Sequence, residues 1–101
     1  MFEENLKNFL DENKKLKQLP SKWKFKVYAL AYLASKLDHQ TVYSEYAINI
    51  VLLNWHVFND CATLRRELYN NGFLTRTTDG KEYRLSDNPP TPEDLINLRQ
   101  C

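Results

Sequence analysis

Gly72 divides the chain into two parts with different hydrophobic periods. Before it, apolar residues recur at three- and four-residue steps, which is the spacing of an amphipathic helix. After it, FLTRT and EYRL are short runs of β-forming residues on either side of TDGK at 78–81. An Asp-Gly pair between two such runs is a strong hairpin signal, because tight hairpin turns need residues that tolerate positive φ. The sequence therefore predicts a helical part followed by a β-hairpin over 73–85.

The helical part begins with two predicted helices. An apolar stripe over 2–17 predicts an amphipathic N-terminal helix, which Leu19-Pro20 ends. A second helix over 22–37 has a wider apolar face, so we expect it to be central. Ser21 is its expected cap, because a serine hydroxyl can accept a hydrogen bond from an amide of the first turn.

Two more helices precede the hairpin, and a short one follows it. The third helix begins at Ser44, its expected cap. The fourth occupies 60–71, is capped by Asn59 or Asp60, and ends in an Asn-Asn-Gly sequence. After a polar linker, Thr91 is followed by proline and two acids, which predicts a short C-terminal helix.

This order of elements is that of a winged helix. We predict an α+β, mostly α, fold with a winged-helix or helix-turn-helix-like domain over 21–85. Residues 1–20 add an extra N-terminal helix, and residues 86–101 form a linker and a short C-terminal helix. In such a domain the helix over 60–71 is the recognition helix, and the hairpin is the wing.

Composition limits the class of protein. The 101 residues are 43% hydrophobic and carry a formal net charge of +1, so one core is expected without the strongly basic footprint of many nucleic-acid-binding proteins. No apolar run approaches the roughly 20 residues that cross a membrane. The first residues lack the apolar core of a signal peptide. We therefore expect a cytoplasmic protein with no membrane partner, in which Cys61 and Cys101 stay reduced.

The predicted recognition helix carries two adjacent arginines, for which we expect different roles. With its leucines facing the core, Arg66 points away and can offer its planar fork to a phosphate or a guanine edge. Arg65 lies at the boundary and is expected to pair with a carboxylate, either Asp60 or Glu45. The alternative is that both arginines are solvated or locally paired, as charged helix faces usually are.

Basic residues of the hairpin can add phosphate contacts. They can equally protect the edge strands against pairing with another sheet, and the sequence leaves both interpretations open. The residues predicted to contact nucleic acid are Asn59, Thr63, Arg66, Asn70, Arg76, Lys81 and Arg84.

Patterns that indicate other chemistry are few. The spacing His56-x-x-x-Asp60 resembles that of some acyltransferases, and Cys61 adjoins it. A single match of this length is common by chance, so we predict that the protein is not an enzyme. His39 and His56 lack metal-ligand spacing with the two cysteines, and turns account for both glycines, so neither a metal nor a cofactor is expected.

The strings YSEYAINIVL and DCATLRRELYNNGFLTRTTDGKEYRL are similar to domain of unknown function 2087. That bacterial family occurs alone or attached to regulators with helix-turn-helix domains. The resemblance is strongest over 43–85 and implies a winged-helix-like domain with a link to transcriptional regulation. The matching residues are Tyr43, Glu45, Asn49, Asp60, Leu64, Arg65, Arg66, Leu68, Gly72, Leu74, Arg76, Gly80 and Tyr83.

Two functional hypotheses result. The leading one is a transcriptional regulator that binds double-stranded DNA through a winged helix. The second is a protein-interaction or effector-sensing module of the same fold that does not bind DNA. A polar set near the turn between the third and fourth helices is expected either to fix their crossing angle or to form a pocket for a small anionic effector or a carboxylate of a protein partner. A homodimer through the exposed apolar edge of the N-terminal helix would favour DNA binding. The polar set is Glu45, Asn49, Asp60 and Arg65.

Overall fold

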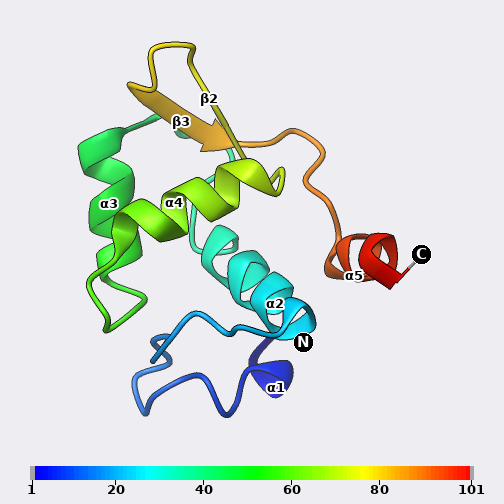
Figure 1. Ribbon diagram of the computed structural model, residues 1–101. Coiled ribbons are helices and arrows are strands. Elements are labelled where there is room, and N and C mark those ends of the chain that lie inside the picture. Colours follow the sequence, from blue (N-terminus) through cyan, green and yellow to red (C-terminus); the bar gives the residue numbers. More distant parts are fainter. Residues whose placement is uncertain (1, 101) are drawn as a thin grey trace.

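The computed structural model describes the backbone of residues 2–100 and the side chains of residues 4–98 (Figure 1). The second cysteine, Cys101, lies outside the described residues. The predicted α+β, mostly helical class is confirmed. In chain order the elements are α1 (Phe2–Asn5), α2 (Trp23–Ala34), β1 (Tyr43–Ser44), α3 (Glu45–Leu53), α4 (Cys61–Asn70), β2 (Leu74–Arg76), β3 (Glu82–Leu85) and α5 (Pro92–Gln100).

The core forms around α2, as its wide apolar face predicts. Leu30 and Leu33 of this helix are fully buried, and Leu64 and Leu68 of α4 pack into the same cluster. Burying a leucine side chain stabilises a fold by about 1.5–3 kcal/mol. In Figure 1, α4 lies between α2 and the hairpin. The leucine contacts with α2 therefore determine which face of α4 remains on the surface.

The hairpin has a third strand beside it that the sequence analysis missed. The antiparallel sheet has the order β1-β3-β2, so β3 is the central strand. Tyr83 of β3 lies opposite Tyr43 of β1 on one side and opposite Arg76 of β2 on the other. Residues directly opposite each other in a sheet share a face. Tyr83 and Leu85 are buried against the helices, so Arg76 also stands on the helix-facing side. The register thereby sends Arg76 toward α4.

The predicted hairpin turn is confirmed. Gly80 adopts a φ of +72°, and its amide donates to the carbonyl of Thr77 at 2.9 Å. The Asp79 carboxylate accepts from the Thr77 hydroxyl at 2.6 Å and from the Lys81 amide at 3.0 Å. These two bonds hold the pKa of Asp79 below its usual value, because both donors favour the ionised form. Local chemistry alone therefore shapes the tip of the hairpin.

The predicted helix ends are mostly correct. The Ser44 hydroxyl accepts from the Ala47 amide at 3.0 Å at the start of α3, and Asp60, rather than Asn59, caps α4. The hydroxyl of Thr91 accepts from the amide of Asp94 at 3.1 Å at the start of α5. The predicted Ser21 cap is wrong, because α2 begins one residue later, after Lys22, without a side-chain cap.

The helix predicted over 2–17 is wrong, since α1 ends at Asn5. The chain instead turns around Asp11, whose carboxylate accepts from the amides of Asn13 and Lys15, each at 2.9 Å. Lys14 adopts a φ of +66°, which an α-helix does not permit. An aspartate that bonds nearby amides offers the backbone an alternative to helix formation, which explains the failed prediction.

The apolar residues of this segment serve the chain's own core. Leu6 and Leu16 are fully buried, and Leu10 is nearly so. Phe2, the first residue of the predicted stripe, lies outside the described side chains. The exposed apolar edge that was expected to support a homodimer is therefore not formed by these leucines. Large exposed apolar side chains occur instead along α3 and just after it, at Tyr46, Ile50, Leu53 and Val57.

His56 joins the N-terminal segment to the turn between α3 and α4. The Asp60 amide donates to its Nε2 at 2.9 Å, so its Nδ1 carries the proton and donates to the Leu52 carbonyl at 2.6 Å. The two residues that flank His56 bond to the N-terminal segment. The Leu16 amide donates to the carbonyl of Trp55, and the Val57 amide donates to the carbonyl of Leu16. The histidine, only 3% exposed, is thus a structural link between three segments.

We expect His56→Ala to lower the free energy of unfolding by about 2–4 kcal/mol, because it leaves a cavity and deprives the partly buried Asp60 amide of its partner. His39, which is exposed, provides the matched control, and His39→Ala should change stability by less than about 0.5 kcal/mol. Urea denaturation followed by circular dichroism measures both. Equal stability of the two variants would contradict the role assigned to His56.

Candidate nucleic-acid interface

The outer face of α4 carries the first part of the site. Leu64 and Leu68 point into the core, so Arg66 and Asn70 project from the opposite side and are exposed. Among the described residues, Arg66 has neither an ion pair nor a hydrogen bond. An arginine in this state keeps all five of its N–H donors available to a ligand.

Asn59 and Thr63 lie around the first turn of α4. Asn59 is exposed and adopts a φ of +53°, a conformation that asparagine tolerates better than most residues. Thr63 is half-buried, and its amide donates to the Asp60 carboxylate at 3.3 Å. These two residues therefore lie at the N-terminal end of α4, and neither lines the space between α4 and the hairpin.

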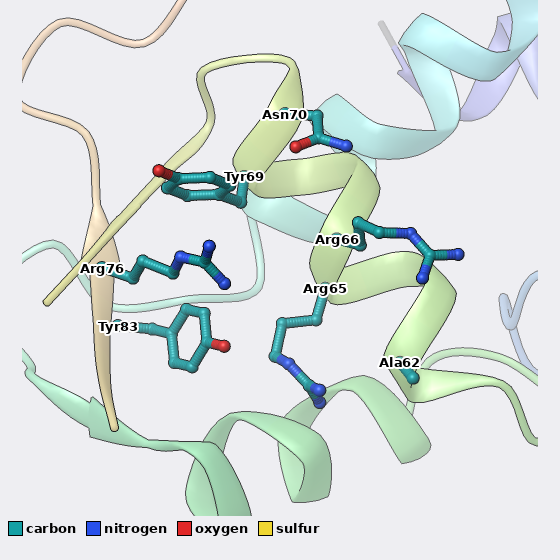
Figure 2. Close-up of a pocket in the computed structure, with 7 residues that line it drawn as sticks. All are labelled: Ala62, Arg65, Arg66, Tyr69, Asn70, Arg76 and Tyr83. Carbon is teal, nitrogen blue, oxygen red and sulfur yellow. The ribbon is translucent and has the colours of Figure 1, made fainter. Parts of the chain in front are cut away.

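A cleft of about 270 Å³ lies between α4 and the hairpin (Figure 2). No acidic side chain is among the described residues that line it. Three of its seven lining residues are arginines, so it concentrates positive charge in a chain that is almost neutral overall. The lining residues are Ala62, Arg65, Arg66, Tyr69, Asn70, Arg76 and Tyr83.

Arg76 is held between two tyrosine rings. Its guanidinium carbon lies 4.3 Å from the centre of the Tyr69 ring, a cation–π distance, and Figure 2 shows the Tyr83 ring on its other side. The neighbouring hydroxyls of Tyr83 and then Tyr69 raise the pKa of Arg76 above its usual value. A tyrosine hydroxyl can donate its proton to an acceptor. The cleft thus combines an oriented cation with hydroxyl donors.

Arg65 connects α4 to α3. Its guanidinium donates to the Asn49 Oδ1 at 2.5 Å and lies 3.9 Å from the Glu45 carboxylate. The guanidinium carbon also lies 5.7 Å from the centre of the Tyr83 ring. Of the predicted polar set, Glu45, Asn49 and Arg65 come together, while the Asp60 carboxylate caps α4. The Arg65 side chain is only 17% exposed, and it also lines the cleft.

The three hairpin residues predicted to contact nucleic acid do not all line this cleft. Lys81 is exposed at the hairpin turn. Arg84 alternates with the buried Tyr83, so it stands on the face away from α4 and pairs with Asp87 at 3.2 Å. Of the three predicted hairpin residues, only Arg76 lines the cleft beside α4.

The spacing that resembled acyltransferases does not produce a histidine–thiol pair. Both ring nitrogens of His56 are bonded to backbone groups, as described above. The Cys61 thiol donates to the Asn49 carbonyl at 3.4 Å, and burial raises the pKa of this thiol. In the part of the chain that the structure describes, no group of three or more potential metal ligands comes together.

Tyr69 and Tyr83 are the site residues that the sequence analysis did not assign. Two signals could have found them. Tyr83 is two residues from Leu85 in β3, which places it on the helix-facing side. Tyr69 follows Arg65 by four residues and Arg66 by three, so it extends the same edge of α4 toward the hairpin.

Comparison with protein families identifies the group to which the chain belongs. The family model described as "Uncharacterized protein conserved in bacteria (DUF2087)" matches residues 15–85, and the chain belongs to this family. The matched region contains every residue that lines the cleft. Neither a curated protein nor a solved structure matches the chain. Within residues 2–100, no helix has the length and apolar character needed to cross a membrane.

The two adjacent arginines are expected to affect stability differently. Arg65→Ala should lower the free energy of unfolding by about 1–2 kcal/mol, because it removes a largely buried hydrogen bond to Asn49 and the contact with Tyr83. Arg66→Ala should change it by less than about 0.5 kcal/mol, because this side chain is exposed and unpaired. Urea denaturation of both variants measures the difference, and equal losses would refute the division of roles.

Proposed function

We propose that this bacterial protein is a winged-helix transcriptional regulator that binds double-stranded DNA through α4 and the β2–β3 hairpin. The order α2, β1, α3, α4, β2, β3, with β1 added to the sheet beside the hairpin, is compatible with that fold. In this proposal α3 and α4 form the helix-turn-helix, and α4 enters the major groove.

The observation that carries the proposal is the outer face of α4. Arg66 is exposed and unpaired, opposite the leucines that anchor the helix, and Asn70 stands one turn further along. An arginine fork matches the two acceptors of guanine, and an asparagine amide matches the donor and acceptor of adenine. These two side chains are therefore the proposed base-reading residues.

The remaining predicted residues are proposed to position the protein on the DNA backbone. Arg76 of the hairpin faces α4, the helix proposed to enter the major groove, and Lys81 is exposed at the hairpin turn. Arg84 is paired with Asp87, but both side chains are largely exposed. An exposed ion pair contributes little, so a phosphate can replace this carboxylate at small cost. Asn59 and Thr63 would add polar contacts at the start of α4.

A second candidate is an effector-sensing or protein-interaction module of the same fold. Two observations favour it: the net charge of +1, and the arginine-lined cleft, which can accept a small anion without DNA. One ion pair limits the support that the net charge gives to this candidate. The acidic Glu67 beside the outer face of α4 is paired with Lys26 at 3.0 Å, so its negative charge only partly offsets the positive charge of the arginines. In neither candidate does the chain act as an enzyme.

The proposal predicts salt-dependent binding to mixed genomic duplex fragments, measured by fluorescence anisotropy. Each neutralised phosphate contributes about −0.9 to the slope of log K against log salt, so about four contacts give a slope near −3.6. Arg66→Ala should weaken binding about 5- to 150-fold at low salt, because it removes a bidentate contact of about 1–3 kcal/mol.

Lys24→Ala is the matched control, since it removes the same charge from an exposed position in the first turn of α2, at the opposite end of the molecule from the hairpin in Figure 1. It should leave both affinity and slope close to those of the unaltered chain. The absence of binding at low salt would refute the DNA-binding proposal and favour the second candidate.

A further inference from the structure

We propose that the cleft between α4 and the hairpin is a seat for one phosphate group, formed by Arg76 and Arg65 with the hydroxyl of Tyr83 between them. This proposal rests on the proposed function only for the source of the phosphate. Figure 2 shows the Arg66 side chain pointing away from the hairpin, so that residue stands at the rim of the seat.

The charge of the cleft favours an anion. Arg65, Arg66 and Arg76 line it together, and none of the described lining residues is acidic. The nearest compensating carboxylate is that of Glu45, which lies 3.9 Å from Arg65 and is 57% exposed. An anion that binds between these side chains is attracted by each of the three positive charges.

The donors are already oriented. Arg76 is held against the ring of Tyr69, with Tyr83 on its other side in Figure 2, and Arg65 is held by its hydrogen bond to Asn49. Tyr83 itself is buried in the sheet. Ordering long side chains is a major cost of binding, so side chains that are held before the ligand arrives gain affinity. Tyr69 and Tyr83 are thus positioning residues for Arg76, and Tyr83 is also a donor.

The arrangement suits a phosphate better than a carboxylate. A carboxylate offers two oxygens in one plane, which a single guanidinium fork can satisfy. In the cleft, the forks come from two different elements, α4 and β2, with a hydroxyl between them. A tetrahedral phosphate directs several oxygens outward at once and can accept from all three groups.

The same chemistry has two sources. The phosphate can belong to the backbone of DNA bound along α4, in which case the seat fixes the hairpin against one strand. It can instead belong to a free phosphomonoester, which would then compete with DNA for the cleft. Both sources need Arg76, and only the first needs DNA binding.

The seat is tested with inorganic phosphate as the probe and the intact chain as the protein. Phosphate is added to isotope-labelled protein while chloride keeps the ionic strength constant, and the amide resonances are followed by NMR. The expected result is saturable movement of the resonances of Tyr69, Arg76 and Tyr83, with a dissociation constant on the order of 1–10 mM. DNA binding is measured in parallel by anisotropy.

Three variants separate the seat from a general effect of charge. Arg76→Ala should weaken phosphate binding at least tenfold, and Arg76→Lys should weaken it as well, because lysine keeps the charge but loses the planar fork. Lys24→Ala removes a charge from the first turn of α2, at the opposite end of the molecule from the hairpin in Figure 1, and should have no effect on phosphate binding. The urea midpoints of all three verify that each variant is folded.

Each outcome has one meaning. Phosphate binding that depends on Arg76, together with DNA binding that phosphate displaces, supports the seat and assigns it to the DNA backbone. Phosphate binding that depends on Arg76 without any DNA binding supports the seat with a free phosphomonoester and refutes the proposed function. If Arg76→Ala behaves like Lys24→Ala toward both phosphate and DNA, the seat is refuted, whether or not the protein binds DNA.

Discussion

Leu64 and Leu68 fix the rotation of α4 about its own axis, because both are fully buried against the cluster around α2. Once they face inward, helical geometry leaves Arg66 opposite the core and turns Arg65 toward α3. The functional difference between two adjacent and identical residues therefore originates in two leucines that contact no ligand. A helix rotated by one residue would bury Arg65 and expose a leucine, at a cost of several kcal/mol.

The register of the hairpin supplies the second half of the surface. Pairing Arg76 with Tyr83 places the arginine on the side that faces α4, while Arg84 faces away and contacts Asp87. A shift of one residue in this pairing would turn the side chains of one strand to the opposite face, so Arg76 and Tyr83 would no longer share a face. The buried positions of Leu74 and Leu85 resist such a shift. Core packing thus determines which positive charge reaches the cleft.

Features that depend on a few neighbouring residues could be predicted from the sequence. The Asp-Gly turn, the Ser44 cap and the end of α4 at Gly72 are of this kind, because each follows from local backbone chemistry. Features that depend on distant partners could not. The N-terminal segment has helical spacing, but its backbone bonds to residues about 40 positions away, and the partner of β1 is equally remote. The same limit determines how much of the site could be predicted. The outward direction of Arg66 follows from the periodicity of one helix. The cleft could not be predicted, because the tertiary fold brings Arg76 and Tyr83 next to α4.

The central claim is that α4 and the helix-facing side of the hairpin form one binding surface. The most direct test is an amide NMR footprint of a duplex DNA fragment on the isotope-labelled chain at low salt. We predict resonance changes that concentrate at Arg66, Asn70 and Arg76 and leave the exposed apolar residues of α3, such as Tyr46 and Ile50, unchanged. Changes confined to α3, or no change at any DNA concentration, would contradict the account.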